Sequence, residues 1–203
     1  MSTIEKTALV FATVLLLLFV VKVMRDVPQK EPSVYYNIVA FGDSLTFGFG
    51  APPSQSYPAL LSERLGVTVR NAGINGELSS EGLQRLPYVL EDAQPDLVIL
   101  CHGGNDILQQ RSLKALENNI EEMVQRILSH GSAVLLVAVP NLSLKGLDAL
   151  PLYKRIAQKY NLLLEEDVLA YVLHHADLKS DMIHPNAKGY AKMAEVLAAS
   201  LNK

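Results

Sequence analysis

The chain has a single cysteine, Cys101, and no tryptophan among its 203 residues. One thiol excludes an internal disulfide framework and any metal site built from several thiolates. Basic residues are also few, since 18 Lys and Arg stand against 21 Asp and Glu, for a formal net charge of -3. Nucleic-acid binders gain affinity from clustered basic residues that neutralise phosphates, so this balance argues against that class of protein.

Charged residues make up only 19% of the chain and hydrophobic residues 49%. This composition excludes a disordered chain, and the length suits one domain with a sizeable core. The mean hydropathy of +0.18 is nevertheless high for a soluble enzyme. An apolar segment outside the folded domain would explain it.

Such a segment lies near the amino terminus. Residues 7–21 include no charged residue, and the apolar character continues past Lys22 to Met24. As a helix, residues 7–24 would span about 27 Å, close to the ~30 Å hydrocarbon core of a bilayer if the Lys22 ammonium reaches the interface. The segment is therefore long enough to cross a membrane.

Two other interpretations of this segment are weaker. A buried core helix would carry an amphipathic stripe, whereas residues 14–21 are apolar on every side. A cleaved signal peptide would end in small residues, and none of the A-x-A type follow the segment. We predict an uncleaved transmembrane helix, with residues 1–30 forming a signal anchor and short linker and residues 31–203 the folded domain.

Strand-like and helix-like patterns alternate after residue 35. Short apolar runs predict strands over 36–41, 67–69, 96–101, 133–139 and 162–164. Helical spacing of apolar residues predicts helices over 57–65, 79–90, 113–128, 152–160 and 187–201. Alternation of this kind predicts an α/β fold, a three-layer α/β/α sandwich in which helices cover both faces of a parallel sheet.

Polar and glycine residues follow the predicted strands. In a parallel α/β sheet, ligands bind beyond the carboxyl ends of the strands. Three such ends carry Gly42-Asp43-Ser44-Leu45, Asn71-Ala72-Gly73 and His102-Gly103-Gly104-Asn105-Asp106, and a late loop carries Asp181-Met182-Ile183-His184-Pro185. We expect these segments to meet at one edge of the sheet.

The residue types in these segments suit nucleophilic catalysis. Ser44 begins a turn whose N–H groups can stabilise negative charge, and His184 is a candidate base for its hydroxyl. Asp181, three residues before His184, can fold back onto one imidazole nitrogen and fix the tautomer. Gly73 can bring a bare N–H close to a substrate, and the Asn105 amide offers a second donor to an oxyanion.

Together these segments resemble the four blocks of the GDSL or SGNH hydrolase superfamily, in the same order. The likeness covers residues 36–203, and two further stretches resemble the bacterial group of periplasmic acyl thioesterases, lysophospholipases and arylesterases. The blocks are Gly42-Asp43-Ser44-Leu45, Gly73, Gly104-Asn105-Asp106 and Asp181-x-x-His184, and the further stretches are Tyr57-Pro58-Ala59-Leu60-Leu61 and Asn71-Ala72-Gly73-Ile74-Asn75-Gly76.

The resemblance implies a flavodoxin-like hydrolase that needs no cofactor and no metal. Ser44 would attack the carbonyl of a small acyl ester or thioester, with His184 as base and then acid, and Asp181 would orient His184. The oxyanion hole would consist of the N–H groups of Ser44 and Gly73 and the amide of Asn105. Two alternatives are a carbohydrate acetylesterase on the same scaffold and a non-catalytic binding domain tethered to the membrane.

Several other polar residues have simpler interpretations. Asp43 suits a helix cap or turn better than a catalytic acid, and Asp106 suits a loop brace. Cys101 lies within an apolar strand and is expected to be buried and inert. His174 and His175 lack the spacing of metal ligands and are expected at the surface.

Four apolar residues near the expected site are candidates for an acyl-binding groove, although core packing would explain them about as well: Phe47, Phe49, Leu108 and Leu142.

Location and assembly depend on the amino-terminal segment and the resemblance. Relatives in the resembling group act in the periplasm, so we expect a single-pass anchor in the bacterial inner membrane with the catalytic domain on the periplasmic side. Lys22, Arg25 and Lys30 outnumber Lys6 across the segment, which favours the opposite orientation. The sequence does not fix the oligomeric state.

Overall fold

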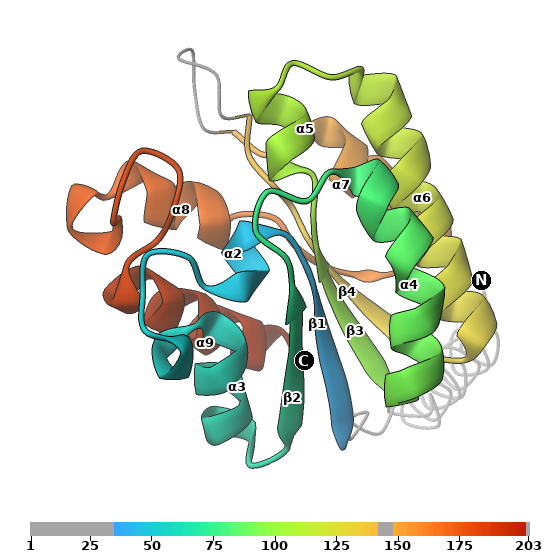
Figure 1. The fold of residues 1–203 in the computed structure, drawn as a ribbon, viewed down its shortest axis with the longest axis horizontal. Helices are drawn as coiled ribbons and strands as arrows, with labels where there is room; N and C mark the ends of the chain where they lie inside the picture. Colours follow the sequence, from blue (N-terminus) through green and yellow to red (C-terminus); the bar gives the residue numbers. More distant parts are fainter. Residues whose placement is uncertain (1–34, 142–147, 202–203) are drawn as a thin grey trace, which may run out of the picture. The chain divides into compact units, whose positions relative to one another are not determined.

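Five parallel strands form one sheet in the computed structural model, which describes residues 35–141 and 148–201 (Figure 1). Every neighbouring pair in the sheet is parallel, so the predicted parallel α/β fold is confirmed. The strands are β1 (Asn37–Gly42), β2 (Thr68–Gly73), β3 (Leu97–Cys101), β4 (Ala133–Val137) and β5 (Leu163–Glu165), in the spatial order β2-β1-β3-β4-β5.

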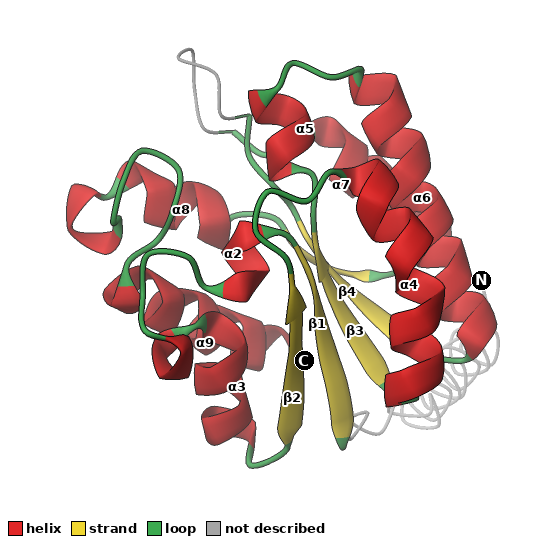
Figure 2. Cartoon of the chain, in the orientation of Figure 1, coloured by secondary structure: helices red, strands yellow, loops and turns green. Residues whose placement is uncertain are grey.

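Helices cover both faces of this sheet (Figure 2). One face carries α2 (Ser44–Phe47), α3 (Tyr57–Leu65), α8 (Val168–His174) and α9 (Ala187–Leu201), with α9 packed on α3 and on α8. The other carries α4 (Ser79–Ala93), α5 (Gly104–Leu108), α6 (Leu113–His130) and α7 (Pro151–Tyr160), with α6 packed on α4 and on α7. Two 3-10 turns, η1 (Pro53–Gln55) and η2 (Ala176–Leu178), complete the elements of the described residues.

The strand order decides where a ligand can bind. The chain runs from β1 outward to β2 and then returns across β1 to β3, so the direction of strand addition reverses between β1 and β3. At such a reversal the connections leave on opposite faces of the sheet and open a crevice beyond the carboxyl ends of the strands. Both Ser44, after β1, and Asn105, after β3, lie at this crevice.

The central strands are buried on both faces. The side chains of Phe41, Leu100 and Leu136 have no solvent exposure, as continuous apolar runs under two helix layers require. The predicted strand over 133–139 ends two residues early, at Val137, although Ala138 and Val139 remain buried. The carboxyl ends of these buried strands form the base of the crevice.

Besides the short helix α2, where the sequence predicts a turn, two helices were not predicted. α5 begins at Gly104 because Gly103, at φ +113°, turns the chain sharply after β3. α8 buries Val168, Leu169, Val172 and Leu173, but it is only seven residues long. Helices this short carry too few turns for their apolar period to stand out in a sequence.

The predicted anchor over residues 1–30 lies outside the described residues, and its membrane insertion and location remain predictions. In residues 35–141 and 148–201, no helix combines the length and the apolar character needed to span a membrane.

Candidate active site

Ser44 stands at the carboxyl end of β1, as the first residue of α2. Its hydroxyl Oγ lies 3.0 Å from Nε2 of His184, which is 140 residues away in sequence. The side chain is half-buried, so it is held in place yet reachable. Asp43 fixes the turn by accepting a hydrogen bond from the Leu45 N–H, which makes it the cap of α2 as the sequence predicts.

Asp181 reaches His184 from three residues earlier in the same loop. Its Oδ2 lies 2.7 Å from His184 Nδ1, while its Oδ1 accepts the N–H groups of Ile183 and His184 at 2.8 Å each. Burial alone would raise the pKa of the Asp181 carboxyl, but these hydrogen bonds outweigh it and hold that pKa below its usual value. An ionised Asp181 keeps the proton of a neutral His184 on Nδ1, so the Nε2 lone pair faces Ser44.

The loop that carries these two residues is itself fixed. The Ser180 N–H donates to the His184 carbonyl at 2.9 Å. The Asn186 side chain accepts the N–H groups of Lys188 and Gly189, which caps the first turn of α9. His184 is therefore positioned by the backbone on both of its sides.

The Asn105 side chain is oriented by a backbone carbonyl. Its amide Nδ2 donates to the Glu77 carbonyl oxygen at 3.0 Å. An amide nitrogen carries two hydrogens, so one remains available to a ligand. Asn105 is half-buried and, with Ser44 and His184, lines one small depression.

Gly73 does not offer the free N–H that the sequence suggested. Its N–H donates to the Asn71 side chain at 2.9 Å, so this donor already has a partner. A Cβ at Gly73 would lie 2.1 Å from the Phe47 nitrogen. The glycine is therefore needed for close packing of β2 against α2.

Gly76 is a candidate that the sequence analysis overlooked. The N–H groups of Ser44 and Gly76 form no hydrogen bonds within the described residues. Gly76 directly precedes Glu77, whose carbonyl holds Asn105, and its φ of +77° suits glycine. The Asn75-Gly76 pair is a turn signal that could have directed attention to this position.

Two buried carboxyls join the loops around this crevice. Asp43, 1% exposed, also accepts the Gly104 N–H at 3.1 Å and so ties β1 to α5. Burial raises the pKa of Asp43 despite these hydrogen bonds. Asp106 accepts the N–H and hydroxyl of Ser79, at 2.8 and 2.7 Å, so it braces the start of α4 rather than its own loop.

The residues expected to be inert are placed accordingly. Cys101 is fully buried, and burial raises the pKa of its thiol far above the usual value. His174 and His175 are exposed, and each Nδ1 lies within hydrogen-bond distance of a carbonyl oxygen in α8. Within the part of the chain that the structure describes, no group of three His, Cys, Asp or Glu residues is placed to hold a metal ion.

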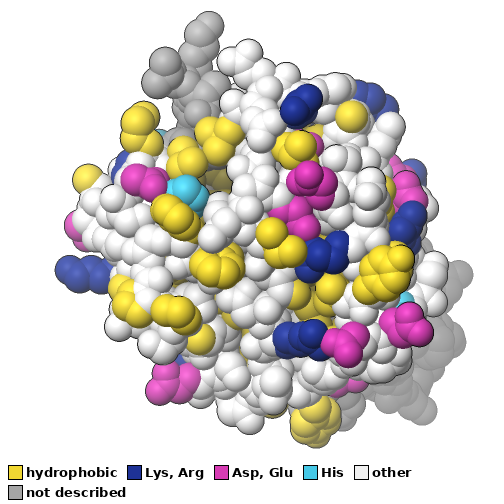
Figure 3. Space-filling view, in the orientation of Figure 1, with side chains coloured by type: hydrophobic (Ala, Val, Ile, Leu, Met, Phe, Trp, Pro, Cys, Tyr) yellow, Lys and Arg dark blue, Asp and Glu magenta, His cyan; other side chains and the backbone are white. Residues whose placement is uncertain are grey.

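The depression at Ser44 is shallow, with a volume of about 10 Å³, which is room for about one water molecule. Leu108 and Ile183 line it. Phe47, 47% exposed, is not among its lining residues, and Leu142 lies outside the described residues. Hydrophobic side chains gather in patches around a histidine on the face drawn in Figure 3.

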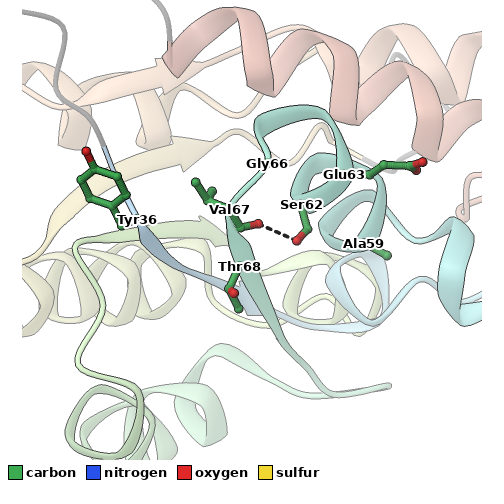
Figure 4. A pocket seen from close by; sticks show the side chains of 7 residues that line it. All are labelled: Tyr36, Ala59, Ser62, Glu63, Gly66, Val67 and Thr68. Carbon is green, nitrogen blue, oxygen red and sulfur yellow. Dashed lines mark hydrogen bonds between the residues drawn. The ribbon is translucent and has the colours of Figure 1, made fainter.

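A wider depression of about 650 Å³ lies at the amino ends of β1 and β2, between them and α3 (Figure 4). Its one serine, Ser62, donates its hydroxyl hydrogen to the Val67 carbonyl at 2.6 Å. No histidine lines this depression, so it has a hydroxyl without a base. Of these two depressions, only the one at Ser44 is lined by both a serine and a histidine.

Comparison with known proteins gives consistent matches. The model of the GDSL-like Lipase/Acylhydrolase family matches residues 40–192. An arylesterase of Vibrio mimicus is 30% identical over 176 residues, or 82% of this chain and 88% of that protein. Thioesterase 1/protease 1/lysophospholipase L1 of Escherichia coli (strain K12) is 29% identical over 175 residues, or 81% and 82% of the two chains. The crystal structure of TesA superposes with a TM-score of 0.71 at 28% identity, covering 81% of this chain and 97% of that one.

Proposed function

Because the chain belongs to the GDSL-like Lipase/Acylhydrolase family and is therefore a GDSL-type esterase or thioesterase, we propose that Ser44, His184 and Asp181 carry its hydrolytic reaction. The observation that supports this assignment most directly is the chain of contacts from Ser44 Oγ to His184 Nε2 and from His184 Nδ1 to Asp181. It joins a nucleophile, a base and an orienting carboxylate.

The reaction follows from these contacts. His184 Nε2 takes the hydroxyl proton as Ser44 Oγ bonds to the acyl carbon, and the carbonyl electron pair moves onto oxygen. When the pair returns, the bond to the leaving alcohol or thiol breaks, and the proton on Nε2 goes to that group. Water then attacks the acyl-serine with the same base, releasing the acid and restoring Ser44.

Charge on the acyl oxygen requires donors that are in place before the reaction. We assign this role to the Ser44 N–H, the free hydrogen of the Asn105 amide and, in place of Gly73, the Gly76 N–H. The N–H groups of Ser44 and Gly76 form no other hydrogen bond among the described residues. The Asn105 amide is already oriented by the Glu77 carbonyl.

The proposed substrate is a small-molecule carboxylic ester or thioester. The relatives named above are an arylesterase and a thioesterase/lysophospholipase, which supports acyl transfer to water. The depression of about 10 Å³ cannot enclose a long acyl chain. A longer chain would have to lie along the exposed apolar side chains of Phe47, Phe49 and Leu108.

A fluorophosphonate probe tests the nucleophile. Because the probe phosphonylates only an activated serine, we expect rapid labelling of Ser44, located by mass spectrometry of the modified peptide. Ser44→Ala should remove the label. Ser62→Ala should keep it, because the Ser62 hydroxyl donates its hydrogen bond to the Val67 carbonyl and has no histidine beside it. A folded protein that takes up no label would favour the non-catalytic binding domain.

Nitrophenyl esters of increasing chain length and acyl-CoA, assayed with the same variants, resolve the substrate class. Preference for acetylated sugars over all of these would favour the carbohydrate acetylesterase.

The role of Asp181 is tested by Asp181→Asn, which we expect to lower kcat at neutral pH about 1,000-fold. An asparagine amide that donates to His184 Nδ1 would leave the proton on Nε2, the nitrogen that faces Ser44. Asp177→Asn changes an exposed aspartate whose carboxylate makes no hydrogen bond within the described residues, and serves as the control. Full activity in Asp181→Asn would contradict the role assigned to this carboxylate.

A further inference from the structure

A buried charged cluster lies directly behind the candidate oxyanion donors. The Glu77 side chain is 5% exposed, and its two oxygens accept the Nε and Nη2 hydrogens of Arg85 at 2.7 Å each. His102 Nε2 lies 3.1 Å from the same carboxylate. The cluster thus joins the loop after β2, helix α4 and the residue that follows β3, near the carboxyl end of the sheet (Figure 1).

The surroundings of Glu77 favour its ionised form. Burial by itself would raise the pKa of its carboxyl, but the hydrogen bonds from Arg85 and His102 outweigh it and hold that pKa below its usual value. The Arg85 Nη2 also donates to the Ala72 carbonyl at 3.1 Å, and its guanidinium lies 4.3 Å from the centre of the Phe41 ring. Arg85 is therefore fixed on several sides and holds the carboxylate rigidly.

His102 is the second residue, after Arg85, that contacts the Glu77 carboxylate. Its ring has no solvent exposure, and its Nδ1 is the buried side-chain nitrogen left without a hydrogen-bond partner in the described residues. A buried N–H without an acceptor costs more than a bare lone pair, so the ring proton belongs on Nε2, donating to Glu77. The Tyr153 hydroxyl holds the His102 carbonyl at 2.7 Å.

The backbone of Glu77 connects this charged cluster to the candidate active site. Its carbonyl accepts the Asn105 amide, and its peptide nitrogen follows Gly76, the proposed third donor. The bidentate contact with Arg85 restrains Glu77, so a tilt of its backbone would strain that contact. The positions of the Asn105 amide and the Gly76 N–H therefore both depend on the position of Glu77.

We infer that Glu77, clamped by Arg85 and His102, is a positioning residue that fixes the Asn105 amide and the Gly76 N–H where the acyl oxygen becomes charged. This inference rests on the proposed function. A buried ion pair is weak grounds for stability alone, because removing charges from water offsets much of their attraction. Preorganised donors, by contrast, gain directly from rigidity.

Glu77→Gln tests the inference, since it keeps the shape and the backbone carbonyl but removes the charge. We expect kcat for a nitrophenyl ester to fall about 10-fold with KM within about twofold, because the donors act on the charged intermediate more than on the bound ester. Arg85→Lys keeps the charge but not the bidentate contact, and its effect should be intermediate. Glu117→Gln breaks a comparable pair with Arg155, where Glu117 is 16% exposed, and should leave kcat unchanged.

A double-mutant cycle separates positioning from general loosening of the fold. If Glu77 acts through Asn105, Glu77→Gln should lower kcat by at most about threefold in an Asn105→Ala background. A full 10-fold loss in that background, or an unchanged kcat in Glu77→Gln alone, would overturn the inference. Ester hydrolysis by Ser44→Ala at a rate within about tenfold of that of the unchanged protein would instead overturn the proposed function, so the two failures are distinct.

Discussion

Ser44→Ala is expected to lower kcat for ester hydrolysis by at least about 10⁵-fold, with the fold intact. The loss is large because no other hydroxyl within the described residues lies at hydrogen-bond distance from His184 Nε2. Residual hydrolysis above the uncatalysed rate should persist, since the variant would retain the backbone N–H at this position and the Asn105 amide. Direct attack of water on the bound ester accounts for that remainder.

The measurement is kcat and KM with a nitrophenyl ester, alongside urea unfolding. Ser44 is half-buried, and among the described residues its Oγ has one hydrogen-bond partner, His184. The free energy of unfolding should therefore change by less than about 1 kcal/mol. Ser62→Ala, in the depression of Figure 4, should keep full activity. Activity in Ser44→Ala within about tenfold of the unchanged protein would exclude Ser44 as the nucleophile.

Much of the arrangement around Ser44 could be predicted, because it depends on rules that are local in sequence. Apolar runs indicated strands, parallel strands brought their carboxyl ends together, and the three-residue spacing of Asp181 and His184 allowed the carboxylate to fold back. Asp43 was predicted as a cap for the same reason, since its acceptor role involves the residue two positions later. Short-range geometry can be inferred from a sequence.

Contacts between distant residues were not predictable in this way. Asp106 was expected to brace its own loop but binds Ser79, 27 residues earlier. Gly73 was expected to offer a free N–H to the substrate, but this N–H donates to the Asn71 side chain. The role of Gly76 depends on Glu77 and Asn105, which lie 28 residues apart. Which donor is free depends on the partners that the fold supplies, and no spacing rule gives those partners.

Gly42→Ala is expected to destabilise the protein by more than about 4 kcal/mol, a large part of the total free energy of unfolding of a domain this size. A Cβ at position 42 would lie 1.9 Å from the Cys101 carbonyl oxygen and 2.4 Å from the Thr46 hydroxyl. The Thr46 side chain could turn away. The Cys101 carbonyl cannot, because β3 is paired with β1 on one side and β4 on the other.

The same clash would reach the site, because Gly42 directly precedes Asp43 and Ser44. Relief by moving the end of β1 would pull Asp43 from the Gly104 N–H and Ser44 from His184. We therefore expect Gly42→Ala to be largely unfolded by circular dichroism and inactive. Gly66→Ala is the matched control, since its φ of +68° costs about 1–2 kcal/mol but a Cβ there meets nothing within 4 Å. Equal stability of these two variants would show that the sheet can widen at Gly42. The close approach of β1 to β3 would then not explain the glycine at this position.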